Sequence, residues 1–233
     1  EIQPILIAAA TRRGKWAYTL NILTANRPQR ERHVEAWRRA LVAMSSRVPA
    51  DAVLDTSRHL SNIGESDQLR LEVLSSAIGR PEEHALSQAE HLELLLTRGL
   101  LRLETNDAAA ALADFQSVAT QASTLSDTQM DRLGRGMVSA HLKEGQIDSA
   151  FNVARELLAQ SAGRGVPLTD DRIVGQFIDT AQRYRRENRK AEVMTICREL
   201  REMLKPAIKP EVGGQLAALE GWVNGSTLTA GNT

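Results

Sequence analysis

The segment TRGLLRLETNDAAAALADF, residues 97–115, holds two helix-forming stretches on either side of a polar break. Before the break, apolar and small residues recur at the i, i+3, i+4 and i+7 spacing of one helical face. These residues are Leu92, Leu95, Leu96, Gly99, Leu100 and Leu103. The break, Thr105 to Asp107, supplies side-chain oxygens that accept hydrogen bonds from the first amides of a new helix. Ala111, Phe115 and Val118 form the next face, so the segment predicts a helix-turn-helix hairpin.

The same hairpin pattern returns twice further along the chain. Aligned on their polar breaks, the three turns read LETNDAAAALADF, LKEGQIDSAFNVA and YRRENRKAEVMTI. A small residue follows each break, at Ala111, Ala150 and Ala191, and these residues are spaced 39 and 41 positions apart. Paired helices with a period of about 40 residues are typical of a solenoid, in which each hairpin buries its apolar face against the next. An alanine at these positions is expected to let two helices approach closely.

The rest of the chain is expected to continue the helical pattern. Glycine-centred breaks at Gly14 and Gly64 look like further repeat turns. Residues 1–85 are predicted to form helical hairpins whose repeat boundaries the sequence leaves open, and residues 86–204 are predicted to form the helix-turn-helix repeats. A C-terminal capping helix is predicted over 205–222, followed by a disordered tail or linker over 223–233. Together they predict an all-α solenoid of about five helix pairs.

Residues 97–115 resemble the tetratricopeptide repeat family in the order of their small and bulky positions. Gly99, Ala111 and Phe115 match the small, small and bulky positions of that family, 12 and 4 residues apart. The resemblance extends through the two later copies, over residues 88–204. It implies a right-handed α-solenoid of tetratricopeptide-like repeats that binds another protein.

The composition favours helices and excludes several classes of protein. Only 3% of the residues are aromatic, while Ala and Leu supply much of the 42% hydrophobic content. The 29 basic and 29 acidic residues balance, so we expect no nucleic-acid partner drawn by a global positive field. No apolar run approaches the roughly 18 residues of a membrane span. All but five of the basic residues are arginine, and we expect a soluble bacterial protein of the periplasm or cytoplasm.

No cofactor, metal or catalytic set is predicted. His84 and His91 are two helical turns apart, or roughly 10.5 Å, which is too far for both to bind one metal ion directly. Cys197 shares an apolar stripe with Val193 and Leu200, so we expect a buried, unreactive thiol. A helical enzyme that uses His84, His91 or His141 is kept as an alternative.

Arginines gather in two places. One cluster consists of Arg27, Arg30, Arg32, Arg38 and Arg39, and the other of Arg183, Arg185, Arg186, Arg189 and Lys190. Guanidinium groups bind phosphate and carboxylate well. Glutamates such as Glu35, Glu187 and Glu192 are interleaved with both clusters, which is typical of a salt-bridged surface and is the favoured interpretation.

The resemblance also implies a partner-binding groove, because the first helices of successive repeats line a concave surface in that family. When the family's register is carried over copy by copy, the residues that it implies for the groove are Glu93, Arg132, Arg135, Ser139, Lys143, Gln176, Thr180 and Arg183. Four of these eight residues are basic, which favours an acidic segment or a peptide carboxyl terminus as the ligand.

The expected function is therefore protein binding and not catalysis. By analogy at the level of the fold, we expect a scaffold or adaptor in a bacterial multi-protein assembly, with secretion or exopolysaccharide export as examples. The sensor or regulatory part of a larger signalling protein is the second interpretation. The partner and the oligomeric state are left open by the sequence.

Overall fold

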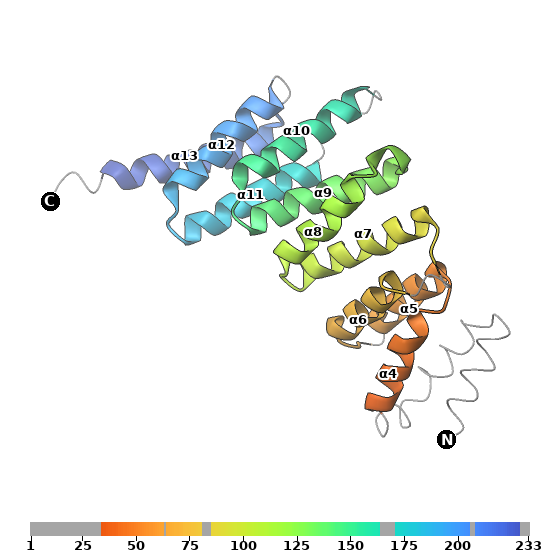
Figure 1. The fold of residues 1–233 in the computed structure, drawn as a ribbon. Helices are drawn as coiled ribbons and strands as arrows, with labels where there is room; N and C mark the ends of the chain where they lie inside the picture. The colour runs from red at the N-terminus through yellow and green to blue at the C-terminus, as the bar shows by residue number, and fades with distance from the viewer. Residues whose placement is uncertain (1–33, 63, 81–84, 164–170, 206–207, 229–233) are drawn as a thin grey trace. The chain divides into compact units, whose positions relative to one another are not determined.

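The computed structural model describes residues 34–62, 64–80, 85–163, 171–205 and 208–228 (Figure 1). Its helices are α4 (Val34–Ser45), α5 (Ala50–Asn62), α6 (Asp67–Ile78), α7 (Gln88–Glu104), α8 (Ala108–Ala119), the short 3₁₀ helix η2 (Ala122–Thr124), α9 (Asp127–Lys143), α10 (Ile147–Gly163), α11 (Asp171–Arg186), α12 (Lys190–Leu204) and α13 (Pro210–Leu228). These ranges contain no β-strand, so the predicted all-α class is confirmed. The predicted turn at Gly14 lies outside the described residues.

The described residues fall into two compact units, which divide between Gln129 and Met130. In the first, α7 packs against α5, α6 and α8, and α6 also packs against α4 and α5. Leu94 and Leu101 of α7 belong to the core shared with α4 to α6, while Gly99 of the same helix meets α8. In the second unit, α12 packs against α10, α11 and α13.

In four helix pairs, the first helix ends in the same kind of turn, which contains one residue in the left-handed conformation. Gly64, Asn106, Gly145 and Asn188 have φ angles of 71°, 62°, 74° and 58°, a region that only Gly and, less readily, Asn adopt without strain. In every case the next residue donates its backbone N–H to the carbonyl five residues earlier, over 2.8 to 3.0 Å. This bond caps the helix end and reverses the chain. The turns at residues 64, 106, 145 and 188 therefore join α5–α6, α7–α8, α9–α10 and α11–α12.

Glycines in the first helix of a pair let the second helix approach closely. A Cβ on Gly99 would lie 2.6 Å from Phe115 Cε1, and one on Gly134 would lie 2.3 Å from Leu157 Cδ2. Ala111, on the same helix as Phe115, is fully buried. The first small position and the bulky position read from residues 97–115 thus meet in one contact, and the second small position is buried on the same helix as Phe115.

One of the three alanines predicted to lie at a close helix contact, Ala191, does not lie at one. Ala111 and Ala150 are fully buried, but Ala191 is exposed. Counted from the left-handed residue of each turn, Ala111 and Ala150 are five residues on, and the residue at that distance from Asn188 is Val193, which is fully buried. The sequence pattern points to the nearest alanine, but α12 fills this contact with the larger Val193.

The C-terminal helix is longer than the predicted capping helix over 205–222. It runs from Pro210 to Leu228, so it continues into the segment predicted to be a disordered tail or linker. Leu216, Leu219 and Val223 are buried at a spacing of three and four residues, which is one helical face. Val223 thus extends the stripe past the predicted boundary.

A glycine substitution tests the close approach of α7 and α8. Gly99→Ala is expected to lower the free energy of unfolding by about 1 kcal/mol or more, because overpacking typically costs about 1–3 kcal/mol and exceeds the helical gain of about 0.5–1 kcal/mol. The matched control is Gly221→Ala on α13, where an added Cβ has no neighbour within 4 Å, and it should stabilise by about 0.5–1 kcal/mol. Equal stabilisation by both variants in urea unfolding would contradict the observed packing.

Candidate binding surfaces

The predicted groove residues fall on the first helices of three pairs. Glu93 lies on α7 in the first unit, is half-buried and accepts a hydrogen bond from Gln129 Nε2 over 2.9 Å. The other seven lie in the second unit, with Arg132, Arg135, Ser139 and Lys143 on α9 and Gln176, Thr180 and Arg183 on α11.

Within the second unit, a contact brings the C-terminal ends of α9 and α11 together. Arg183 Nη2 donates to the carbonyl of Leu142 over 3.1 Å, and Lys143, the next residue on α9, is exposed. Arg135, further up α9, forms an ion pair with Asp131. Cations of both helices therefore lie at one end of the α9–α11 pair.

Thr180 does not fit the predicted groove. It is only 8% exposed, so it offers almost no surface to a partner. The reason is helical phase, since Phe177 and Tyr184 are three residues before it and four residues after it, and both are buried. Thr180 thus faces the core side of α11. Gln176 is half-buried, and its amide oxygen is a buried acceptor for which no partner is found among the described residues.

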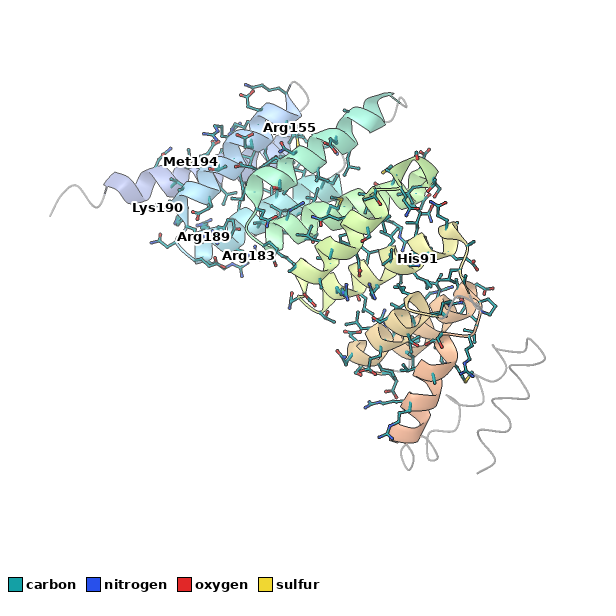
Figure 2. All side chains as sticks on the ribbon, in the orientation of Figure 1. His91, Arg155, Arg183, Arg189, Lys190 and Met194 are labelled. Carbon is teal, nitrogen blue, oxygen red and sulfur yellow. The ribbon has the colours of Figure 1, made fainter. Side chains whose placement is uncertain are left out.

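The second arginine cluster surrounds the turn between α11 and α12, where Figure 2 labels Arg183, Arg189 and Lys190. Arg189 carries the ion pairs of this turn, with Nη2 2.9 Å from Glu192 Oε1 and Nη1 3.6 Å from Glu187 Oε2. The pKa of Glu192 is lowered by its own backbone N–H and by Arg189. The salt-bridged interpretation is therefore right for Arg189.

Of the first arginine cluster, only Arg38 and Arg39 lie within the described residues. Arg38 Nη2 lies 3.6 Å from Glu65 Oε2, which links α4 to the start of α6 by an ion pair. Arg39 is exposed. Arg27, Arg30 and Arg32 lie outside the described residues.

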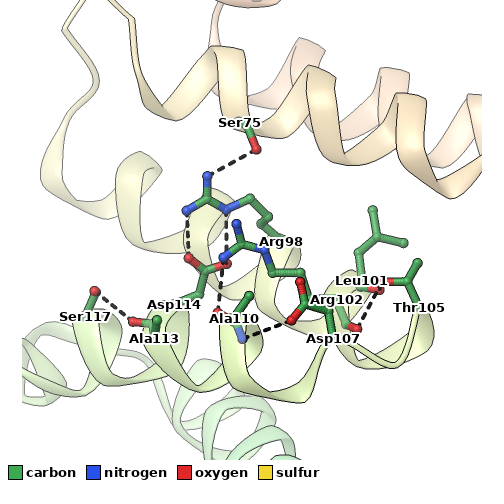
Figure 3. A network of polar contacts seen from close by, with 10 residues as sticks. All are labelled: Ser75, Arg98, Leu101, Arg102, Thr105, Asp107, Ala110, Ala113, Asp114 and Ser117. Atoms are coloured by element: carbon green, nitrogen blue, oxygen red, sulfur yellow. Dashed lines mark hydrogen bonds and ion pairs between the residues drawn. The ribbon is translucent and has the colours of Figure 1, made fainter.

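A buried polar network connects α6, α7 and α8 (Figure 3). Asp114 accepts hydrogen bonds from Arg98 Nη2 at 2.6 Å, Arg98 Nε at 3.0 Å and Arg102 Nη1 at 2.8 Å. Arg98 Nη1 also donates to Ser75 Oγ at 3.2 Å. This network is not predicted from the sequence, although one signal is present there, since Asp114 lies between Ala111 and Val118 on an apolar stripe.

Residues that could support catalysis do not converge in the described part of the chain. Burial and the nearby Glu220 raise the pKa of the Cys197 thiol to about 11, so the thiolate is disfavoured near neutral pH. His91 is half-buried on α7, His141 Nδ1 lies 2.7 Å from Gln146 Oε1, and His84 is not described. The described residues contain no group of three His, Cys, Asp or Glu side chains placed to bind a metal ion.

A small cavity lies between α4 and α5. It is lined by Leu41, Met44, Ser45, Val48, Ala52, Val53 and Thr56 and has a volume of about 10 Å³. That is about the space needed by one water molecule. This cavity is too small for a substrate or cofactor.

These features define an all-α protein of paired helices, with one buried charged network around Asp114 and further charged side chains at helix ends and on exposed faces. Comparison with family models, with curated proteins and with solved structures gives no match. Within the described ranges, none of the helices is long and apolar enough to cross a membrane.

Proposed function

We propose that this chain is a right-handed α-solenoid of about five tetratricopeptide-like repeats that acts as a protein-interaction scaffold in a bacterial multi-protein assembly. The observation that carries the proposal is the repeated hairpin, since four helix pairs share one left-handed turn and one capping hydrogen bond. Stacked hairpins present long surfaces for binding and need no deep cavity. Fold-level analogy favours secretion or exopolysaccharide export as the setting.

The partner that fits best is a protein segment rich in Asp and Glu. Met194, at 37% exposure, is the only large hydrophobic side chain that is exposed among the side chains that the structure describes. An isolated exposed methionine is ordinary and does not make an apolar docking patch. Polar and charged contacts would therefore supply most of the recognition on the described surface.

The α9–α11 pair offers such contacts over a considerable length. Arg132 and Lys143 are 11 residues apart on α9, which is about three helical turns and roughly 16 Å on one face. Arg183 of α11 lies beside the end of α9 through its bond to the Leu142 carbonyl. An extended acidic segment that runs along α9 would contact Arg132 first and reach Lys143 at the far end.

The test uses a fluorescein-labelled, glutamate-rich peptide and fluorescence anisotropy. Reversing charge with Arg132→Glu and Lys143→Glu together should weaken binding about tenfold or more, because each lost charge contact contributes on the order of 1 kcal/mol. The thermal midpoint should change little, since Lys143 is exposed and Arg132 only half-buried, and charges near the surface contribute about 0–1 kcal/mol to folding. The control is Arg47→Glu, an exposed arginine of the first unit, which should bind like the wild type. Equal affinity in the charge-reversed variant and the wild type would remove α9 as the binding face.

A further inference from the structure

The turn between α11 and α12 carries an excess of positive charge that its own acids do not neutralise. It contains Arg183, Arg185, Arg186, Arg189 and Lys190. The two nearby acids, Glu187 and Glu192, both pair with Arg189. Arg185, Arg186 and Lys190 make no ion pair with a carboxylate within the described part of the chain, and the first two are exposed. Three cations are therefore available to an outside anion.

Aromatic rings contact three of the four arginines of this turn. Arg183 Cζ and Arg189 Cζ lie 5.3 and 4.0 Å from the centre of the Tyr184 ring, and Arg185 Cζ lies 5.8 Å from the centre of the Trp222 ring. A ring face positions a guanidinium group by cation–π attraction and uses none of its N–H donors. The donors of Arg185 thus keep their ability to bind a planar carboxylate with two parallel hydrogen bonds.

Helix stability alone does not explain these cations. The C-terminal end of a helix favours positive charge, which accounts for Arg183, Arg185 and Arg186 at the end of α11. The N-terminal end disfavours it, yet Lys190 is the first residue of α12 and Arg189 is its N-cap, without a side-chain capping bond. By contrast, Asp107 caps α8 by accepting from the Ala110 amide. Arg189 is held in its position by Glu192 and the Tyr184 ring, but Lys190 places a positive charge at the start of α12, where the helix dipole disfavours it.

We propose that this turn is a docking surface for carboxylate side chains of an acidic protein segment, with Arg185, Arg186 and Lys190 as the contact residues and Trp222 as a positioning residue. The inference rests on the proposed function and adds a second contact for the same class of partner. A protein segment fits better than nucleic acid or an anionic membrane, because the chain has no net charge and the interleaved Glu187 and Glu192 would repel a dense array of phosphates.

The experiment titrates the same glutamate-rich peptide against turn variants of the whole chain. Arg185→Glu with Arg186→Glu should weaken binding about tenfold or more, while the loss of positive charge at the end of α11 should lower the thermal midpoint only slightly. Arg185→Lys with Arg186→Lys keeps the charge but loses the planar donor pair, so it should weaken binding about threefold or more. Arg47→Glu again serves as the control.

Each outcome separates this inference from the proposed function. If the turn variants bind like the wild type while Arg132→Glu with Lys143→Glu binds weakly, the inference is wrong and the proposed function stands. If the wild type does not bind the peptide at all, both are wrong. Tighter binding of a labelled single-stranded oligonucleotide or of phosphatidylserine vesicles than of the peptide would overturn the partner class. A lower thermal midpoint with unchanged affinity would assign the cations to folding.

Discussion

Asp114→Ala should lower the free energy of unfolding by about 3–5 kcal/mol, because removal of one partner leaves buried charge without compensation. The side chains of Asp114, Arg98 and Arg102 are 4%, 15% and 22% exposed. Without the carboxylate, the two guanidinium groups would stand close together in a mostly buried site. Asp114→Asn keeps an acceptor but not the charge, and it should destabilise less.

The control for this prediction is a surface ion pair of the same unit. Asp55 and Arg58 pair across one helical turn, with side chains 63% and 76% exposed, so Asp55→Ala should cost less than about 1 kcal/mol. Both variants are compared with the wild type by urea unfolding. If Asp114→Ala costs no more than Asp55→Ala, the network in Figure 3 does not hold α6, α7 and α8 together.

Ala150→Arg should be the other strongly destabilising change. Ala150 is fully buried in the core of the second unit, which also contains Phe151, Phe177 and Val193. The rings of Phe151 and Phe177 stack in this core with centroids 4.0 Å apart, and a long side chain placed among such close-packed residues must displace them. Overpacking costs about 1–3 kcal/mol, and burial of an unpaired charge adds several more.

The matched control is Ala191→Arg, which makes the same substitution at the alanine that the sequence pattern treated as equivalent. Because Ala191 is exposed, this variant should change the free energy of unfolding by no more than an ordinary surface substitution does, about 0.5 kcal/mol. Ala150→Val is a milder test if the arginine variant does not fold. Equal melting temperatures for Ala150→Val, Ala191→Arg and the wild type would mean that Ala150 is not at a close helix contact.

The hairpins could be predicted from the sequence because local chemistry fixes them. Asn106 and Gly145 are residues that tolerate positive φ, and each precedes a new helix by two residues. The apolar stripes on either side select the buried faces. Ala191 was misassigned because a repeat tolerates either a small or a larger side chain at this contact, and only the packing reveals Val193 there.

The candidate site was less predictable, since it depends on pairs that are far apart in the sequence. Thr180 was expected in the groove, but its position around the α11 helix places it on the buried face with Phe177 and Tyr184. The bond from Arg183 to Leu142 joins residues 41 positions apart. The contact of Arg185 with Trp222 likewise joins α11 to α13. Contacts between such distant residues have no local sequence signature. The arginines could therefore be predicted as a cluster from the sequence, but their contacts with Leu142 and Trp222 could not.

The central claim is that this helical-repeat chain binds acidic protein segments, and its most direct test is binding of the wild-type protein to two labelled peptides. One is the glutamate-rich peptide, and the other has every glutamate replaced by glutamine. We expect saturable binding of the glutamate peptide that weakens as salt rises above about 0.1 M, where charges are screened beyond about 10 Å, and much weaker binding of the glutamine peptide. Equal binding of both peptides, or glutamate-peptide binding that salt leaves unchanged, would contradict the claim.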